Sequence, residues 1–259
     1  MARFCPLFSG SSGNSIYIGN NDGGILVDTG MSAKKIGEAL FNIGVAPESL
    51  NAVFVTHEHS DHIKGLRVFA SKYHIKVYGT NGTLSALDDM GKFETEEVSF
   101  SGNEAGPLFV TPFHTSHDAR ESCGYKIDCS DGRKISIATD LGEMTEEVFS
   151  AVSGSDLVML ESNHDVMMLE NGPYPYSLKK RILGKKGHLS NDACASTAER
   201  LVSGGTTRIY LGHLSRENNM PALAYQTTCS ALTMAGAKEN SDYILKVAKP
   251  VCDEKAMIL

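Results

Sequence analysis

The chain lacks the features that would assign it to the membrane, secreted or repeat proteins. Its longest apolar runs fall far short of the roughly 20 residues that a membrane-spanning helix needs. The six cysteines include no Cys-x-x-Cys pair, which favours free thiols in a reducing cytoplasm over a disulfide framework. No signal-peptide hydrophobic region, linker or internal repeat is recognisable. We therefore expect one globular domain over residues 1–259, located in the cytoplasm.

An excess of positive charge is also missing. The 24 lysines and arginines are outnumbered by 31 aspartates and glutamates, so the formal net charge is −7. This balance argues against a protein that coats nucleic acid through bulk electrostatics. It still permits a local basic groove, or a cationic metal centre that binds phosphate.

Three histidines and an aspartate gather within six residues, in His57-Glu58-His59-Ser60-Asp61-His62, directly after an apolar run. Imidazole and carboxylate are the usual nitrogen and oxygen donors for zinc, manganese or iron. In an extended segment His57 and His59 point the same way, and a turn at Ser60 lets Asp61 and His62 face a second point nearby. One short loop can therefore supply ligands to two adjacent metals. The alternative is a polar loop with histidines by chance, which is improbable when the whole chain has nine.

The rest of the chain alternates strands with helices. Strands are expected at residues 3–8, 15–19, 24–30, 51–56, 75–78, 96–100, 107–113, 124–128, 134–138, 156–160, 208–211 and 243–248. Helices are expected from a Ser32 cap to Gly44, through 63–73, near 80–90 and 145–152, at 163–170 and 175–183, after Ser190 and after Pro221. Asp131-Gly132 signals a hairpin between two of the strands. Two groups of strands among helices predict a layered α/β fold.

Acids and histidines stand where apolar runs end. The five places are Asp28, the histidine loop, the pair His114 and His117, Asp140, and His213. Each alone would more simply be a surface or capping residue. Ligands are expected at strand ends on one rim of a scaffold, so five in sequence indicate a site.

Two further segments could contact phosphate. The small-residue loop at residues 9–14, with Ser12 and Asn14, can turn backbone N–H groups toward an anion, although such a loop is more often only a tight connection. The run Lys179-Lys180-Arg181-Ile182-Leu183-Gly184-Lys185-Lys186-Gly187 has no acid and leads to His188. A charge run is usually a solvated face, but here Lys185 and Lys186 would suit a phosphate-binding strip.

These motifs resemble, in this order, those of the metallo-β-lactamase superfamily: Val27-Asp28-Thr29-Gly30, His57-Glu58-His59-Ser60-Asp61-His62, His117, Asp140 and His213. The resemblance covers essentially the whole chain. It implies an α/β fold (α+β in some schemes), a four-layer αββα sandwich that carries a binuclear metal site. One metal would be held by His57, His59 and His117, and the other by Asp61, His62 and His213. Asp140 and a hydroxide would bridge them, and Asp28 would orient a ligand histidine.

The third ligand of the first metal has two candidates. Phe113-His114-Thr115 looks like the motif of glyoxalase-type members. His117 lies seven residues before Gly124, a spacing that resembles the nuclease branch. We choose His117, which leaves His114 as a core or hydrogen-bonding residue.

Leu160-Glu161-Ser162 and Gly187-His188-Leu189-Ser190 resemble the paired glutamate and histidine motifs of ribonuclease Z. In that family the histidine, oriented by the carboxylate, protonates the leaving oxygen of a phosphodiester while a metal-bound hydroxide attacks. The resemblance assigns catalytic roles to Glu161, His188 and Asp61. Without it, a helix cap and a surface histidine would be the simpler interpretation.

A further resemblance is to the YycJ/WalJ-like group of bacterial exonucleases. Its signatures read here as Phe8-Ser9-Gly10-Ser11-Ser12-Gly13-Asn14-Ser15, Ser116-His117-Asp118-Ala119, Glu161-Ser162-Asn163-His164-Asp165 and Gly187-His188-Leu189-Ser190-Asn191. The group is associated with 5′-to-3′ cleavage of double-stranded DNA. His164 belongs to the pattern, but no physical role follows for it.

The leading hypothesis is a metal-dependent phosphodiesterase, a 5′-to-3′ DNA exonuclease with two divalent ions (zinc, manganese or iron), acting on DNA in preference to RNA. The alternatives are a ribonuclease and a hydrolase of a small ester, thioester or cyclic phosphate. The short stretch after His213 disfavours the glyoxalase-type enzymes, which carry an extra helical domain there. The absence of a long insertion between Asp140 and His213 disfavours a ribonuclease J-like enzyme. A binding module that has lost catalysis would show broken ligand positions, and here every position is filled.

Overall fold

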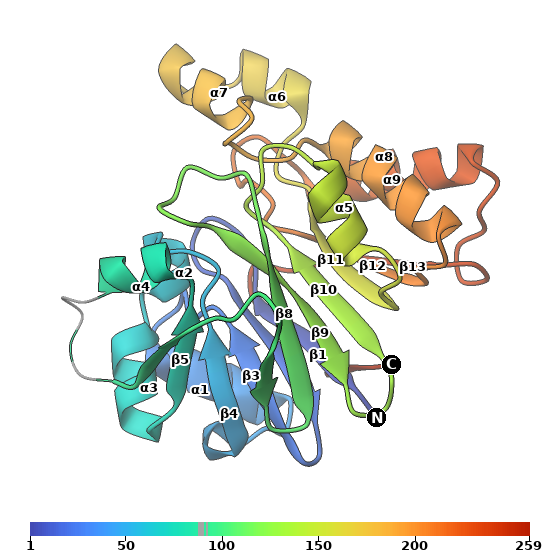
Figure 1. Ribbon diagram of the computed structural model, residues 1–259. Coiled ribbons are helices and arrows are strands. Elements are labelled where there is room, and N and C mark those ends of the chain that lie inside the picture. The colour runs from blue at the N-terminus through green and yellow to red at the C-terminus, as the bar shows by residue number, and fades with distance from the viewer. Residues whose placement is uncertain (88–90, 92) are drawn as a thin grey trace. The chain divides into compact units, whose positions relative to one another are not determined.

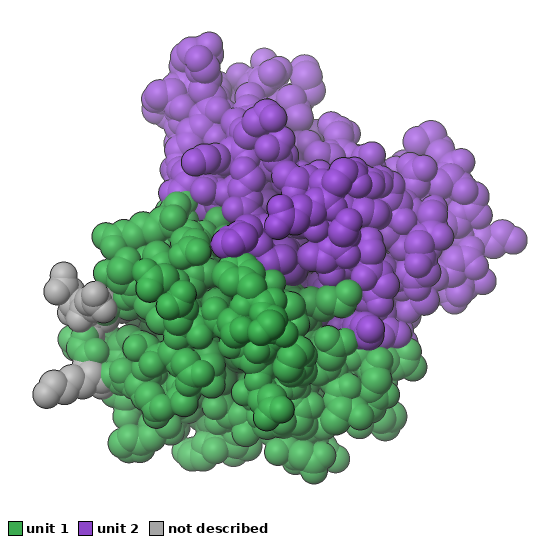
Figure 2. All heavy atoms as spheres, in the orientation of Figure 1, with its two compact units in different colours: residues 1–112, 119–133, 249–259 green, residues 113–118, 134–248 purple. Residues whose placement is uncertain are grey.

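The computed structural model describes residues 1–87, 91 and 93–259, and it divides into two compact units. Unit 1 comprises residues 1–112, 119–133 and 249–259, and unit 2 comprises residues 113–118 and 134–248 (Figure 2). Each unit has its own strands, helices and apolar core, so each is described separately.

Unit 1 is built on a mixed seven-stranded sheet (Figure 1). Its order is β14 (Met257–Ile258), β1 (Arg3–Phe8), β2 (Ser15–Asn20), β3 (Gly23–Val27), β4 (Leu50–Phe54), β5 (Lys76–Gly79) and β6 (Thr95–Glu97). The pairs from β14 to β3 are antiparallel, and those from β3 to β6 are parallel. The apolar runs of β3 and β4 are buried, as expected for parallel strands covered on both faces.

Helices α1 (Ala33–Asn42), α2 (Ser60–Ile63), α3 (Leu66–Tyr73) and α4 (Asn81–Leu87), with the 3₁₀ turn η1 (Pro47–Ser49), complete this part of unit 1. The Ser32 hydroxyl accepts the N–H of Lys35 and so caps α1, as the sequence predicts. The apolar faces of α1 and α3 bury Ile36 and Phe69 in one cluster with Val53 of β4. Full burial of each such side chain stabilises the fold by about 1.5–3 kcal/mol.

Each unit contains further strands. Unit 1 contributes β7 (Asn103–Ala105), β9 (Cys123–Cys129) and the first residues of β8 (Leu108–His114), in the order β9-β8-β7. In unit 2 the order is β13 (Ile244–Val247), β12 (Arg208–Gly212), β11 (Leu157–Glu161) and β10 (Lys134–Ala138), all parallel. The expected turn at Asp131-Gly132 is present, because the N–H of Cys129 donates to the carbonyl of Arg133.

The helices of unit 2 are α5 (Glu146–Val152), α6 (Val166–Asn171), α7 (Tyr176–Ile182), α8 (Asn191–Ser203) and α9 (Pro221–Met234). Helices α5, α8 and α9 bury Val148, Leu201 and Leu232 in one cluster with Val158 and Ile209 of the sheet. Each unit is therefore a sheet with helices packed on it, which agrees with the predicted layered α/β fold.

Three details of the sequence-based assignment were wrong or incomplete. The single helix expected over 63–73 is two helices, because the N–H of Gly65 donates to Thr29 O and a Cβ on Gly65 would lie 2.0 Å from Met31 O. Strands β7 and β14 were not predicted, and β3 and β4 end at Val27 and Phe54 rather than at residues 30 and 56. The helix expected near 80–90 is confirmed up to Leu87, while 88–90 lie outside the described residues.

In the part of the chain that the structure describes, no helix combines the length and the apolar character that a membrane span requires.

All six cysteines are free thiols, as predicted. Two of them meet in unit 1, where Cys5 of β1 and Cys252 have their Sγ atoms 3.4 Å apart. The contact with Cys5 lowers the pKa of the half-buried Cys252 thiol below its usual value, which makes this sulfur the more reactive of the two.

We expect mild oxidation with diamide to join Cys5 and Cys252. The disulfide would close a loop of 247 residues and stabilise the fold by about 2–4 kcal/mol, raising Tm by roughly 5–10 °C. Intact mass (loss of two hydrogens) and calorimetry measure the two effects. In Cys252→Ser, diamide should leave Tm unchanged. Continued alkylation of both thiols after oxidation would contradict the prediction.

Candidate metal centre

Three of the predicted site residues adopt a left-handed backbone conformation. The φ angles are 63° at Asp28, 57° at Asp140 and 55° at His213. They follow the ends of β3, β10 and β12, in each case within two residues. Such a conformation costs on the order of 1–3 kcal/mol for a residue other than glycine, and it concentrates at functional sites. The strand ends singled out in the sequence are therefore specialised turns.

In unit 1 the histidine loop brings four candidate ligands together. The ring centroids of His57 and His59 lie 4.6 Å apart, and those of His57 and His62 lie 4.1 Å apart. His59 is the residue that precedes α2, and the first turn of that helix carries Asp61 and His62. The turn at Ser60 that the spacing predicted is thus the start of a helix.

Asp28 fixes the orientation of this loop. Its Oδ2 accepts Nδ1–H of His62 (2.8 Å) and the hydroxyl of Thr56 (2.8 Å), and its Oδ1 accepts the Thr56 N–H (2.8 Å). The Thr56 hydroxyl gives its only proton to Asp28, so it accepts Nδ1–H of His57 (3.0 Å). Both imidazoles are therefore held in the tautomer whose Nε2 carries the lone pair, which is the form that binds a metal.

The loop at residues 9–14 packs against the histidine loop. The Asn14 amide Nδ2 lies 3.0 Å from His62 Nε2 and 3.3 Å from Asp61 Oδ2, and the Asn14 N–H donates to Asp61 O (2.8 Å). Asn14 is buried and Ser12 is half-buried. The structure thus gives Asn14 a role in holding Asp61 and His62, which the sequence did not suggest.

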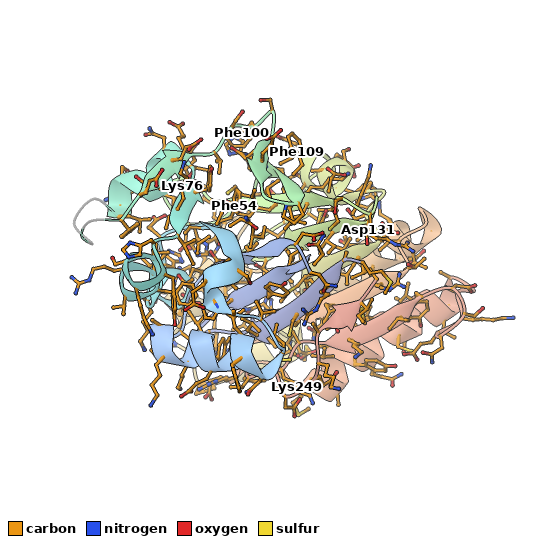
Figure 3. The ribbon with its side chains drawn as sticks, turned by 90° about the horizontal axis from the view of Figure 1, so that it is seen from below. Phe54, Lys76, Phe100, Phe109, Asp131 and Lys249 are labelled. Atoms are coloured by element: carbon orange, nitrogen blue, oxygen red, sulfur yellow. The ribbon has the colours of Figure 1, made fainter. Side chains whose placement is uncertain are left out.

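Aromatic packing supports the strand that leads into the histidine loop (Figure 3 labels Phe54). Phe54 of β4 stacks on Tyr78 with ring centroids 4.8 Å apart, and it meets the edge of Tyr125 at 5.4 Å. The Tyr125 hydroxyl donates to the carbonyl of Val55 (2.6 Å). This buried support restricts the backbone from which His57 projects.

Unit 2 contains a second group of candidate ligands. Asp140, Glu161, His188 and His213 each offer one ligand atom, and these atoms lie within 4.8 Å of one another. Glu161 is fully buried at the end of β11, and its Oε1 accepts Nδ1–H of both His188 (2.8 Å) and His213 (2.9 Å). Its Oε2 accepts the N–H groups of Leu141 (2.9 Å) and Leu189 (3.2 Å).

Four hydrogen bonds keep Glu161 ionised. Burial raises the pKa of its carboxyl, but the charges and hydrogen bonds of His188 and His213 outweigh this and hold the pKa below its usual value. An ionised carboxylate only accepts, so both imidazoles must donate from Nδ1. Glu161 therefore directs the Nε2 lone pair of each imidazole away from itself.

The structure distinguishes the two histidines after β8. His117 is buried, and its Nδ1 donates to the carbonyl of Gly187 (3.0 Å). Its Nε2 lies 3.9 Å from Asp140 Oδ1, and burial lowers its pKa below the usual value for histidine. His114 is exposed at the end of β8. His117 is thus oriented as metal-binding histidines usually are, with Nδ1–H on a backbone carbonyl.

The basic segment before His188 is attached to unit 2 through its backbone. The Ser116 hydroxyl donates to the carbonyl of Lys185 (2.7 Å), and the His188 N–H donates to Ile182 O (3.0 Å). The Lys185 side chain is exposed and lies 3.3 Å from Glu143, and Lys186 is exposed as well. Both lysines lie between α7 and His188, and their role in phosphate binding stays a prediction.

One residue of the site, Thr56, was missed in the sequence, and another, His164, was named there without a physical role. Thr56 connects Asp28 with His57, and its position directly before His57 was the only available signal. His164 is 1% exposed, and among the described residues its ring nitrogens have no hydrogen-bond partner. Burial lowers the pKa of His164 to about 4, so this imidazole is neutral at physiological pH.

Comparison with known proteins gives the family. The Metallo-beta-lactamase superfamily pattern matches residues 9–213. The chain is 37% identical to exodeoxyribonuclease WalJ of Streptococcus pneumoniae serotype 2 over 248 residues, which cover 93% of this chain and 92% of that protein. It is 38% identical to exodeoxyribonuclease YycJ of Bacillus anthracis over 240 residues, 90% of each chain. The metallo-β-lactamase fold protein YhfI from Bacillus subtilis has a similar structure, with a TM-score of 0.73 at 16% identity over 97% of this chain and 98% of that one.

These findings confirm the resemblances stated for the sequence, both to the superfamily and to the YycJ/WalJ-like group. They also confirm the fold class, since the two mixed sheets with their helices match a solved structure of this fold over almost the whole length. The clusters of imidazoles and carboxylates, with tautomers fixed for binding, fit divalent metal ions. The chain belongs to the metallo-β-lactamase superfamily and is a metal-dependent hydrolase of that family.

Proposed function

We propose that the chain is an exodeoxyribonuclease that degrades DNA from the 5′ end with two divalent ions and His188 as general acid. One observation carries the proposal: the single carboxylate of Glu161 orients both a candidate metal ligand, His213, and a candidate acid, His188. A protein that only bound metal would need the contact of Glu161 with His213 but not its contact with His188. The names of the two similar exodeoxyribonucleases support DNA as the substrate.

The proposed ligands follow the motifs of the family and the tautomers found within each unit. His57, His59 and His117 would hold one ion, Asp61, His62 and His213 the other, and Asp140 would bridge them. The ions, which could be zinc, manganese or iron, would supply an activated water and offset charge on the phosphate. Residues 1–259 would then act as one domain, and the free thiols favour the cytoplasm as its location.

The side chains of the protein would orient the ligands, donate a proton and bind the substrate. Asp28 and Thr56 keep His57 and His62 in the metal-binding tautomer, and Asn14 holds the Asp61 backbone and carboxylate. His188, with Nδ1–H on Glu161, directs Nε2 outward, where a proton can pass to the leaving 3′ oxygen. Lys185 and Lys186 of unit 2 would bind flanking phosphates, and so would Ser12 and the small-residue loop of unit 1.

A substrate panel tests this function. With Mn²⁺ or Zn²⁺, the protein would be offered 5′-phosphorylated duplex DNA labelled at either end, single-stranded DNA, RNA and a thioester. We expect a 5′ label to be released as a mononucleotide at once, while a 3′ label reports a ladder of shortening strands. EDTA and Asp61→Ala should each abolish cleavage, whereas Asp22→Ala, at an exposed aspartate of unit 1, should not.

Three outcomes would contradict the proposal. Cleavage that survives in Asp61→Ala would identify a contaminant. Preferential cleavage of RNA would assign the chain to the ribonucleases. Hydrolysis of the thioester alone would indicate a small-ester hydrolase.

A further inference from the structure

Helix α7 (Tyr176–Ile182) is largely exposed, with Leu178, Lys179 and Ile182 half-buried. None of its residues is buried, and Tyr176 is 75% exposed. In Figure 1, α6 and α7 stand apart from α8 and α9 of the same unit. A short helix without a fully buried residue gains little from packing, and Tyr176 lies outside its half-buried part, so packing does not account for the exposed aromatic ring.

The charge on α7 has one sign. Lys179, Lys180 and Arg181 form its last turn, and no acid occurs between Glu170 and Asp192. Arg181 is paired with Asp118, whereas no acid of the described residues pairs with Lys180. Instead, Lys180 Nζ lies 5.6 Å from the centroid of the Tyr176 ring. A cation beside an exposed aromatic face is the combination found where proteins bind single-stranded nucleic acid.

The C-terminal end of α7 is fixed to the proposed catalytic residues. The His188 N–H donates to Ile182 O (3.0 Å), and the Gly187 carbonyl accepts Nδ1–H of His117 (3.0 Å). A Cβ on Gly187 would lie 2.1 Å from Ile182 O, so this close approach requires glycine. Tyr176 lies six residues before Ile182, which is about 9 Å along the helix. A base on Tyr176 would therefore be a few nucleotides away from a phosphate at His188.

We propose that Tyr176 and Lys180 form a platform that binds a single-stranded segment of the substrate, with a base stacked on the Tyr176 ring and a phosphate on Lys180. This inference rests on the proposed nuclease function and adds the strand state of the bound segment. An intact duplex keeps its bases paired and would contact the lysines through phosphates only. The exposed ring therefore favours an unpaired base over a duplex as its partner.

Binding of a phosphorothioate-linked oligonucleotide, which resists cleavage, tests the platform with the metal-loaded enzyme. Fluorescence anisotropy would compare a short single strand with the corresponding duplex. We expect Tyr176→Ala to weaken single-strand binding roughly 5- to 100-fold, the effect of losing one base–aromatic stack, and Tyr176→Phe to restore it. Lys180→Ala should reduce the slope of log K against log salt by about 0.7. Phe41→Ala, at an aromatic residue of α1 that is 80% exposed, is the matched control.

Unchanged single-strand affinity in Tyr176→Ala would overturn the inference, as would an equal loss for the duplex. Tighter binding of a glutamate-rich peptide than of the oligonucleotide would assign α7 to an acidic protein partner instead. Because the oligonucleotide is not cleaved, this assay is independent of the substrate panel. A protein that cleaves DNA but binds it without Tyr176 would retain the proposed function and lose only the platform.

Discussion

Replacing Glu161 with glutamine is expected to lower kcat/KM for DNA cleavage by about 10³-fold or more. The change affects two functions at once, because Glu161 Oε1 accepts Nδ1–H of both His188 and His213. Loss of the partner of a metal-binding histidine typically costs about 10- to 100-fold in metal affinity. Loss of a general acid typically costs about 10²- to 10⁴-fold in rate.

The physical reason is a conflict of donors. Each of the two carboxylate oxygens of Glu161 accepts two hydrogen bonds. A glutamine amide has one oxygen that accepts and one NH₂ group that donates. The N–H groups of Leu141 and Leu189 cannot change, so the oxygen will face them and the NH₂ will face the imidazoles. Each imidazole must then accept at Nδ1 and carry its proton on Nε2. In that tautomer Nε2 of His213 carries a proton and has no lone pair for a metal.

Metal titration by calorimetry and steady-state kinetics on labelled DNA measure the two losses. Glu199→Gln, at an exposed position on α8, is the matched control and should behave as the wild type. Normal metal binding with reduced rate in Glu161→Gln would restrict the role of the carboxylate to His188. Wild-type values for both would refute the role assigned to Glu161.

Gly30→Ala is expected to destabilise the fold by about 3–5 kcal/mol, among the largest effects of a single substitution. A Cβ on Gly30 would lie 1.6 Å from Asp61 O and 2.5 Å from Asn14 N, and both are backbone atoms. The Gly30 N–H also donates to Asn14 O (2.7 Å). The methyl group must therefore separate the loop that carries Asp61 from the loop that carries Asn14.

Urea unfolding measures the loss in the free energy of unfolding, thermal unfolding measures the change in Tm, and metal analysis measures the metal content. Tm should fall by roughly 10 °C, and the purified variant should retain less metal than the wild type. Gly37→Ala, within α1, is the matched control. Among the described residues, a Cβ on Gly37 would meet only the Tyr73 hydroxyl of α3, at an ordinary contact distance of 3.5 Å. That substitution should stabilise the helix by about 0.5–1 kcal/mol. Unaltered stability of Gly30→Ala would show that the loops can separate at little cost.

The local features of the fold could be predicted because their causes lie within a few residues. The Ser32 cap, the alternating strands and helices, and the turn at residues 129–133 all follow from short-range chemistry. The break between α2 and α3 could not be predicted in this way. Its cause is the close approach of Gly65 to Thr29 and Met31, more than thirty residues earlier in the chain.

The candidate site shows the same division. The types of ligand residue and their positions at strand ends could be predicted from the sequence. Imidazoles and acids that repeatedly follow apolar runs are typical of a functional site at one edge of a fold. The tautomers were not, since they depend on Thr56, Asp28, Glu161 and the Gly187 carbonyl, which only the fold brings to the histidines. The structure adds a physical argument for choosing His117 over His114: His117 is buried, and its Nδ1 contacts the Gly187 carbonyl.

The course of the chain through the two units determines the order in which they can form on a ribosome. Residues 134–248 of unit 2 are contiguous, whereas unit 1 needs its last strand, β14, which pairs with β1 at the opposite end of the chain. The Leu259 N–H donates to Ala2 O (3.0 Å), so this edge closes only after residues 257–259 have been synthesised. Until then β1 presents an unpaired edge, which is a typical starting point for aggregation. A nascent chain stalled before residue 249 would therefore be more prone to aggregation than a chain that includes β14.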